Sequence, residues 1–166
     1  MANRTTVNSQ TKVVSPESNF DQIRAKTAHL PKPVVFTNGC FDILHRGHIT
    51  YLEQARNIGA SLIVAVNTDN SVHSQNKGSD RPINVLEDRM SVLASLESVD
   101  SVVCFDDETP LRLINVILPD HIVKGGDWKI QDIVGAKEVI ANGGQAHSID
   151  FKFQRSTTSL LKKIRT

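Results

Sequence analysis

The sequence predicts an α/β fold: a Rossmann-like, doubly wound parallel sheet of five strands with helices on both faces, in a single domain. Short apolar segments of strand length alternate along the chain with longer segments in which apolar residues recur every three to four positions. Strands that alternate with helices at this spacing are joined by right-handed crossovers, which produce a parallel sheet covered on both faces. The length of 166 residues suits one domain, and we find no internal repeat.

The N-terminal segment, residues 1–15, is rich in Thr, Asn, Ser and Gln and has no apolar period. Such a segment buries too little apolar surface to fold, so we expect a disordered tail. The folded domain is then expected at residues 16–166, with its core in 33–166. Its first helix is expected within residues 16–30, with Ser15 as the N-cap residue.

Five apolar segments are expected to form the sheet. These strands cover residues 34–37, 62–66, 101–105, 121–124 and 145–149. The helices between and after them are expected at residues 47–58, 84–98, 111–118 and 133–141, with a last one starting at 156–158. Residues that commonly start or stop helices support these limits, namely Gly59, Asn84 with Glu87, and Thr109 with Pro110. The polar residues 67–81 show no period and are expected to form a long loop.

Composition argues against several classes of protein. The formal net charge of +1 gives no general attraction to nucleic acid or to an anionic membrane. No apolar run approaches the roughly 18 residues of a membrane-spanning helix, and the N-terminus lacks the apolar core of a secretory signal. Cys40 and Cys104 lie in apolar surroundings without zinc or disulfide spacing, which favours a reducing compartment. We therefore expect a soluble, cytoplasmic protein with no nucleic-acid partner and no membrane contact.

Residues 34–48 join an apolar strand to a helix through small and titratable residues. Gly39 lets the backbone turn there and approach a ligand. The helix start offers unpaired backbone N–H groups and the positive end of the helix dipole, which together favour phosphate. His45 and His48 are three residues apart, so both fall on one helix face and can donate to one phosphate. The alternatives are core histidines, a solvated face, or a zinc site that would need ligands from scattered histidines.

Polar stretches follow the predicted strands at residues 38–48, 67–81, 106–110, 125–128 and 155–159. Ligands of open parallel sheets bind at the carboxyl ends of the strands, so these stretches are expected to ring one crevice. Each also has a simpler interpretation as a turn, a helix cap, a packing residue or a solvated charge. Neither a P-loop nor a Gly-x-Gly-x-x-Gly motif follows the first strand, which argues against a P-loop NTPase and an ordinary dinucleotide dehydrogenase.

Two of these stretches resemble motifs of a known family. Residues 38–48, Asn-Gly-Cys-Phe-Asp-Ile-Leu-His-Arg-Gly-His, look like the signature of the cytidylyltransferase-like nucleotidyltransferases. Residues 155–159, Arg-Ser-Thr-Thr-Ser, resemble their C-terminal phosphate-binding motif. Between them, residues 66–69, 81–84, 87–90 and 123–128 resemble the heptose 1-phosphate adenylyltransferase branch. The resemblance covers the chain from about Pro33 to its C-terminus.

The resemblance implies transfer of AMP from ATP to D-glycero-β-D-manno-heptose 1-phosphate, giving ADP-heptose and pyrophosphate for lipopolysaccharide core synthesis. It also implies Mg²⁺ carried mainly by ATP, a homodimer or higher homo-oligomer, and a separate sugar kinase and phosphatase in the same pathway. A sugar phosphate is already ionised, so catalysis needs positioning and charge neutralisation rather than a general base. The alternatives are a cytidylyltransferase acting on glycerol 3-phosphate or another small phosphate, and a non-catalytic nucleotide-binding regulatory module. An RNA-linked module is disfavoured by the lack of a basic face.

The resemblance assigns residues to three roles. Catalytic contact with the phosphates is expected from His45, His48, Lys77 and Arg89. Nucleotide contact is expected from Thr37, Asn38, Gly39, Cys40, Phe41, Gly47, Lys124, Gly125, Asp127, Arg155, Ser156, Thr157 and Thr158. Sugar-phosphate contact is expected from Asp42, Asn67, Asp69, Arg81 and Trp128. No protein ligand is assigned to the metal, although Asp42 or Asp127 could touch it. The glycerol-phosphate branch carries an arginine at the position of Phe151, and Arg155 is expected to replace it.

Overall fold

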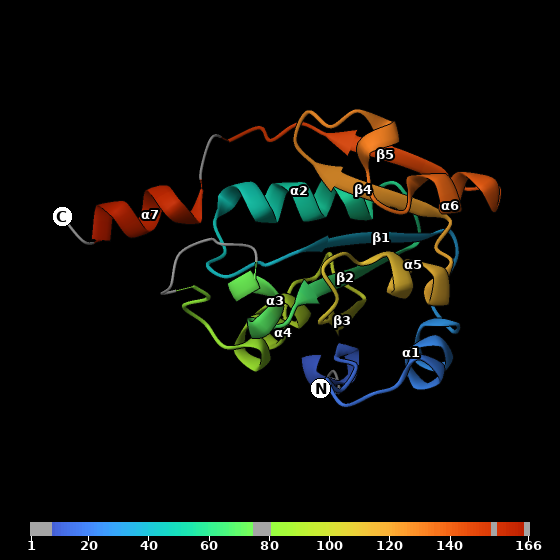
Figure 1. Cartoon of the computed structure of the whole chain (residues 1–166), viewed down its shortest axis with the longest axis horizontal. Coiled ribbons are helices and arrows are strands. Elements are labelled where there is room, and N and C mark those ends of the chain that lie inside the picture. The colour runs from blue at the N-terminus through green and yellow to red at the C-terminus, as the bar shows by residue number, and fades with distance from the viewer. Residues whose placement is uncertain (1–7, 75–80, 154–155, 165–166) are drawn as a thin grey trace, which may run out of the picture.

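Five parallel strands form the centre of the computed structural model, which describes residues 8–74, 81–153 and 156–164. The strands are β1 (Val34–Gly39), β2 (Ser61–Asn67), β3 (Ser101–Phe105), β4 (His121–Gly125) and β5 (Gln145–Ile149). Their order in the sheet is β3-β2-β1-β4-β5, and all four pairings are parallel (Figure 1). The predicted fold class is therefore confirmed, with β3 and β5 at the predicted limits.

Helices cover both faces of the sheet. They are α1 (Phe20–Thr27), α2 (Arg46–Arg56), α3 (Asp69–Ser74), α4 (Leu86–Ala94), α5 (Leu111–Ile117), α6 (Ala136–Ala141) and α7 (Thr157–Ile164), with short 3-10 helices η1 (Ser9–Lys12) and η2 (Ile130–Asp132). The buried residues of α2 and α4 share one apolar cluster, and those of α1, α5 and α6 share the other. Helix α7 extends away from the sheet on the side of the carboxyl strand ends (Figure 1).

Alternation along β1 shows why the sheet needs both layers. Val35 packs into the cluster of α2 and α4, whereas Val34 and Phe36 pack into the opposite cluster. Successive side chains of a strand point to opposite faces, so a continuous apolar strand requires cover on both sides. Every residue of β2 is buried. No helix among the described residues is both long and apolar enough to cross a membrane.

The expected disordered tail at residues 1–15 is wrong for residues 8–15, which are ordered and contact the sheet. Residues 1–7 lie outside the described part of the chain. The 3-10 helix η1 precedes Val14, which is 2% exposed and whose N–H donates to the carbonyl of Val102 at 2.9 Å. Val13 also bridges to Val102 on edge strand β3. Two adjacent apolar residues are too few to show a period, so the sequence pattern did not reveal this docking onto the sheet.

Helix limits differ from the prediction where side chains find other partners. Helix α1 starts after Asn19, which forms a capping box with Gln22, rather than after Ser15. Gly59 is not a left-handed cap; a Cβ there would lie 2.4 Å from the carbonyl oxygen of Pro33, so close packing requires glycine. Thr109 does not cap α5, whose N-cap position is occupied by Pro110 without a side-chain bond.

The segment between β2 and α4 also differs from the prediction. Residues 67–81 were expected to form a long loop, but Asp69–Ser74 is helix α3, whose residue Ser71 donates its N–H to Oγ1 of Thr68. The expected capping box of Asn84 with Glu87 is absent, because the amide of Asn84 donates to the carbonyl of Asp42 instead. Helix α4 consequently begins at Leu86 and ends at Ala94. Helix α6 is shorter than expected as well, with η2 before it.

Candidate active site

The two central strands β1 and β4 separate before they reach the carboxyl edge of the sheet. Their last paired residues are Phe36 and Ile122. Beyond this pair, the hydroxyl of Tyr51 from α2 lies 2.6 Å from Oγ1 of Thr37 and donates to the carbonyl of Val123 at 3.1 Å. The hydroxyl thus bridges the strands where their backbone pairing stops. The strand order reverses here, which is where open parallel sheets bind ligands.

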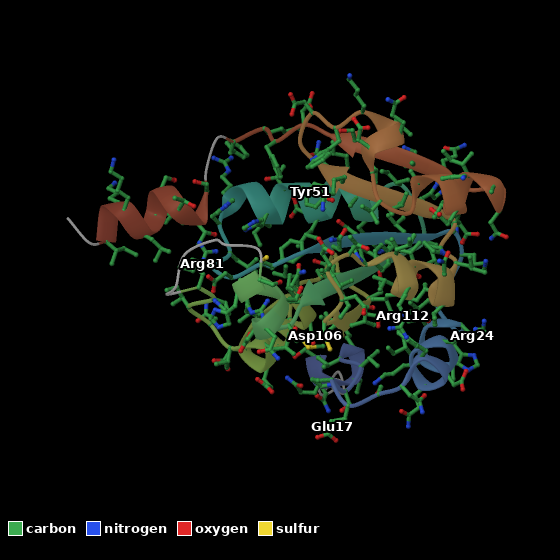
Figure 2. All side chains as sticks on the ribbon, in the orientation of Figure 1. Glu17, Arg24, Tyr51, Arg81, Asp106 and Arg112 are labelled. Carbon is green, nitrogen blue, oxygen red and sulfur yellow. The ribbon has the colours of Figure 1, made fainter. Side chains whose placement is uncertain are left out.

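Tyr51 was not among the predicted site residues. It is 5% exposed, and burial raises the pKa of its hydroxyl above the ordinary value. Its ring centroid lies 5.7 Å from that of Phe151, and Figure 2 shows Tyr51 on α2 above the centre of the sheet. A Cβ at Gly125 would lie 2.5 Å from the Phe151 ring, so glycine allows this packing. The one feature of the sequence that could have identified Tyr51 is its position next to Leu52, on the face of the helix that is expected to be buried.

The turn from β1 into α2 brings the two predicted histidines together. His45 is the N-cap of α2, and its Nδ1 accepts the N–H of His48 at 3.4 Å. The two rings are stacked, with centroids 3.8 Å apart and planes at 15°. Phe41, held at a positive φ of 47°, places its ring edge-on to His48 at 5.5 Å. A Cβ at Gly47 would approach the His45 ring to 3.0 Å, so this position is close to requiring glycine.

The surroundings of His48 are suited to binding an anion. Its Nδ1 is buried and has no hydrogen-bond partner among the described residues. Burial, and then the neighbouring His45, lower the pKa of His48 to about 4. Burial also lowers the pKa of His45. An anion bound against these rings would favour their protonated forms and so reverse the shift. A phosphate oxygen bound in this place could be the hydrogen-bond partner of His48 Nδ1.

A cavity of about 350 Å³ opens beside His48. It is lined by Cys40, Phe41, Asp42, His48, Arg81, Thr157 and Thr158. Two helix starts meet at this cavity, because His48 lies in the first turn of α2 and Thr157 begins α7. The hydroxyl of Thr157 donates to the carbonyl of Ile43 at 3.4 Å, which attaches α7 to the turn before α2. Both helix dipoles favour an anion here.

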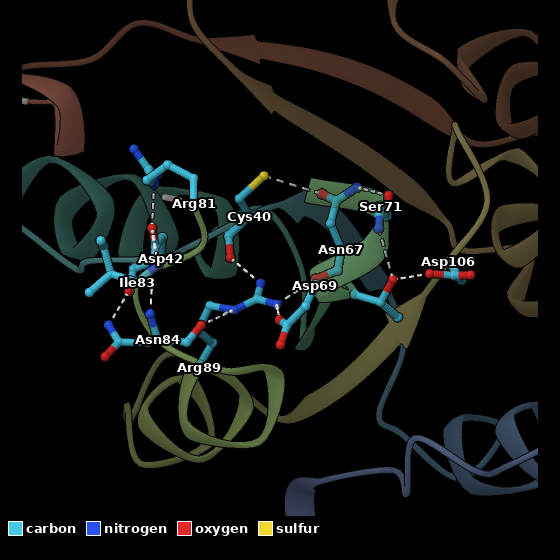
Figure 3. Close-up of polar contacts among 11 residues, drawn as sticks. Cys40, Asp42, Asn67, Asp69, Ser71, Arg81, Ile83, Asn84, Arg89 and Asp106 are labelled. Atoms are coloured by element: carbon cyan, nitrogen blue, oxygen red, sulfur yellow. Dashed lines mark hydrogen bonds and ion pairs between the residues drawn. The ribbon is translucent and has the colours of Figure 1, made fainter. Parts of the chain in front are cut away.

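Asp42 holds one wall of this cavity. Its carboxylate, in a residue only 3% exposed, accepts the N–H groups of Ile83 and Asn84 at 2.9 Å and a bond from Nε of Arg81 (Figure 3). Arg81 lies beside the carboxyl strand ends, on the side from which α7 extends (Figure 2). We expected Asp42 to contact the sugar phosphate. In this structure it positions Arg81, which is the member of the pair with further donors for a ligand.

Arg89, which is predicted to contact the phosphates, lies among buried polar groups and lines a cavity with Phe41 and Asp42. It is 2% exposed, and its guanidinium donates to the carbonyls of Cys40, Asn67 and Asn84 at 2.7, 2.8 and 3.0 Å. A fourth bond goes to the carboxylate of Asp69 at 2.7 Å. Figure 3 shows the guanidinium at the centre of these groups. Arg89 therefore joins the carboxyl ends of β1 and β2 to α4 through four hydrogen bonds inside the protein.

The other predicted residues fall into three groups. Asn38, Asn67, Lys124 and Trp128 line a second cavity of about 190 Å³ at the strand ends. Asp127 is exposed on the turn after β4, and Ser156 bonds Ser159 near the start of α7. Lys77 and Arg155 lie outside the described residues. Asn84 was not predicted as a site residue, because its tie to Asp42 joins positions 42 residues apart.

Comparison with known proteins agrees with this geometry. The family model described as cytidylyltransferase-like matches residues 36–161. The chain is 56% identical over 136 residues to D-beta-D-heptose 1-phosphate adenylyltransferase from Bordetella bronchiseptica, covering 82% of this chain and 84% of that protein. It is 60% identical over 131 residues to the bifunctional protein HldE from Histophilus somni, but it spans only 27% of that longer protein.

Two solved structures share this fold. The lipopolysaccharide core biosynthesis protein from Thermoplasma volcanium has a TM-score of 0.60 and 25% identity, covering 74% of this chain and 98% of that chain. Pantoate-beta-alanine ligase from Francisella tularensis, at 16% identity and a TM-score of 0.58, covers 88% of this chain and 68% of its own, and it shows the fold alone. From the family match, the relatives and the paired-histidine turn together, the chain belongs to the cytidylyltransferase-like family of nucleotidyltransferases.

Proposed function

We propose that this protein transfers AMP from ATP to D-glycero-β-D-manno-heptose 1-phosphate, giving ADP-heptose and pyrophosphate. The reaction would supply a precursor of the lipopolysaccharide core. Support for the acceptor comes from the 56% identity to a D-beta-D-heptose 1-phosphate adenylyltransferase over most of both chains. Support for the chemistry comes from one observation above all: His45 and His48 are stacked at the start of α2, and the buried Nδ1 of His48 has no hydrogen-bond partner in the part of the chain that the structure describes.

In the proposed reaction, an oxygen of the sugar phosphate attacks the α-phosphorus of ATP. A new P–O bond forms as the bond to the β-phosphate oxygen breaks, and the electron pair leaves with pyrophosphate. His45, His48 and the helix N–H groups would hydrogen-bond the phosphate oxygens as charge redistributes. The attacking phosphate is ionised at neutral pH, so no side chain needs to remove a proton. Catalysis then rests on positioning and electrostatic stabilisation.

Mg²⁺ is part of the proposal as a companion of ATP. Among the described residues, no group of three or more His, Cys, Asp or Glu side chains is arranged to hold a metal ion. The carboxylate of Asp42 already accepts three N–H donors. These residues fit an ion held mainly by phosphate oxygens and water, as magnesium commonly is. The ion would neutralise charge on the triphosphate.

The cellular setting completes the proposal. We place the protein in the cytoplasm, acting on ATP and a sugar 1-phosphate as a homodimer or higher homo-oligomer, without a nucleic-acid or membrane partner. A sugar kinase and a phosphatase would act in the same pathway as separate proteins. The kinase step would precede this one, because the acceptor must carry phosphate before AMP can be attached.

Pyrophosphate release with a panel of substrates tests the proposal. We expect turnover with ATP and heptose 1-phosphate to exceed that with CTP and glycerol 3-phosphate by at least 100-fold in kcat/KM, a difference of roughly 2.7 kcal/mol in transition-state binding. Preference for CTP and glycerol 3-phosphate would replace the proposal with a cytidylyltransferase. Tight ATP binding without pyrophosphate release for any acceptor would indicate a regulatory module.

A further inference from the structure

The second cavity has a chemistry unlike that of the cavity beside His48. Its volume is about 190 Å³, and it lies where β1, β2, β3 and β4 end. Among its described lining residues, Glu108 and Asp132 are acidic and Lys124 is basic, whereas in the cavity beside His48 the carboxylate of Asp42 is already bonded to Arg81 and to two backbone N–H groups. Carboxylates repel a triphosphate, but they accept hydrogen bonds from hydroxyl groups. The charges therefore separate a phosphate region from a region suited to a neutral polyhydroxyl group.

The size of the second cavity also favours a sugar as its ligand. Pockets for drug-sized ligands commonly enclose roughly 300–1,000 Å³. At about 190 Å³ this cavity is too small for a nucleoside triphosphate and suits a single sugar ring. The lining mixes Phe105, Pro110 and Ile133 with polar side chains, as expected where one face of a ligand is apolar and its rim is polar.

Trp128 provides a flat apolar wall that is held in place. Its side chain is 48% exposed, yet its backbone N–H donates to Oγ of Ser148 at 3.0 Å and its indole Nε1 donates to the carbonyl of Gly125 at 3.1 Å. Gly126 has a φ of 114°, and a Cβ there would approach the indole nitrogen to 3.2 Å. The indole donor is used internally, and Nζ of Lys124 lies over the ring at 5.9 Å from its centroid. The ring therefore offers the ligand apolar surface beside a cation rather than a hydrogen bond.

The two cavities share one wall. Cys40 lines the cavity beside His48, Asn67 lines the second cavity, and the thiol of Cys40 contacts Oδ1 of Asn67 at 3.7 Å. The two cavities are therefore adjacent, as the sugar site and the phosphate site of one ligand must be. Glu108 lies before α5 and Asp132 ends η2, so the two carboxylates reach the cavity from separate segments of the chain.

We propose that this second cavity is the acceptor subsite, in which Glu108 and Asp132 bind sugar hydroxyls and Trp128 packs on the sugar ring. The inference deepens the proposed function and rests on it for the identity of the sugar. Both carboxylates are on exposed residues, and neither makes a side-chain hydrogen bond or ion pair within the described part of the chain. Replacing them should alter ligand binding without disturbing the fold.

Binding and turnover are measured separately, so that the two proposals can fail separately. Isothermal titration calorimetry with heptose 1-phosphate compares the wild type with Glu108→Ala, Asp132→Ala and Trp128→Ala. Hydroxyl bonds to charged acceptors justify an expected increase in Kd of about tenfold to 100-fold for either carboxylate variant. KM for ATP should stay within about twofold of the wild type. Asp107→Ala is the matched control, because Asp107 is adjacent in sequence but pairs with Arg112 outside the cavity.

Each outcome decides one of the two proposals. Unchanged sugar affinity in Glu108→Ala and Asp132→Ala overturns the acceptor subsite, and so does a rise in KM for ATP without a change in sugar affinity. If the wild type binds heptose 1-phosphate and the variants lose this affinity, the subsite stands. Absence of pyrophosphate release by the wild type would then defeat the proposed function alone. If the wild type does not bind heptose 1-phosphate in the calorimeter, the acceptor subsite is overturned, whatever the pyrophosphate assay shows.

Discussion

His45 and His48 form a stacked pair whose centroids are 3.8 Å apart, with Nδ1 of His45 accepting the backbone N–H of His48. His45 is therefore both the cap of α2 and a wall for its neighbour. The pair leaves the buried Nδ1 of His48 without a partner among the described residues, so a ligand oxygen is the group that would complete it.

Replacing His48 by Ala should lower kcat with ATP and heptose 1-phosphate by about 100-fold to 1,000-fold, the usual cost of removing one donor to a transition-state oxyanion. Pyrophosphate release measures the effect. His29→Ala is the control, since His29 is exposed and belongs to no cavity wall described above. Near wild-type turnover by the His48 variant, with its fold intact by circular dichroism, would remove the histidine from the mechanism.

The lowered pKa of His48 predicts how stability depends on pH. The ordinary value is 6.5 and the folded value is about 4, so the unfolded chain binds the proton more tightly. The free energy of unfolding therefore contains a contribution from neutral, buried His48. This contribution is complete above about pH 6.5 and is lost as the pH falls toward 4. Urea unfolding between pH 4 and 7 measures it. His48→Asn should show a shallower loss of unfolding free energy on acidification; an identical pH profile would contradict the assigned burial.

ATP binding should reverse this pKa shift, because a bound phosphate favours the protonated imidazole. We expect ATP binding to be accompanied by proton uptake at about pH 6, beyond the protons that ATP itself exchanges. Calorimetry in two buffers of different ionisation enthalpy measures the uptake. The His48→Asn variant should take up fewer protons than the wild type. Equal uptake by both proteins would show that another group titrates.

Arg89→Ala should lower the free energy of unfolding by about 3–5 kcal/mol, as expected when one partner of a buried charged network is removed. Three backbone carbonyls and the carboxylate of Asp69 lose their donor. Urea denaturation gives the value. Arg112→Ala is the matched control, because its side chain is 68% exposed and its ion pair with Asp107 lies at the surface. That control should stay within about 1 kcal/mol of the wild type.

Tyr51→Phe removes the hydroxyl that bridges β1 and β4. Leaving the carbonyl of Val123 and the hydroxyl of Thr37 without this partner should cost about 1–3 kcal/mol in unfolding free energy. KM for ATP should rise as well, because the crevice between the strands loses its fixed width. In the double variant with Thr37→Val, one orphaned group disappears, so the combined loss should be smaller than the sum of the two single losses.

The sequence by itself determined the fold class and identified the turn that carries His45 and His48. Apolar periodicity reports which side chains face a core, and that was enough to predict five parallel strands and most of the helices around them, although α3 and η1 were missed. The residues 38–48 motif is contiguous, so its turn and its two histidines could be recognised without knowing what packs beside them. The family and fold predictions are confirmed by the family match and the structural comparisons.

Tertiary structure alone decided which partners the polar side chains have. Asp42 meets Arg81 across 39 positions, and Arg89 meets Cys40 across 49, so no local pattern could show that these pairs satisfy one another inside the protein. The same holds for the second cavity, whose walls come from the ends of four strands. Burial can be predicted from the sequence pattern near each residue. The hydrogen bonds of a polar side chain depend instead on which groups the folded chain brings within reach of it.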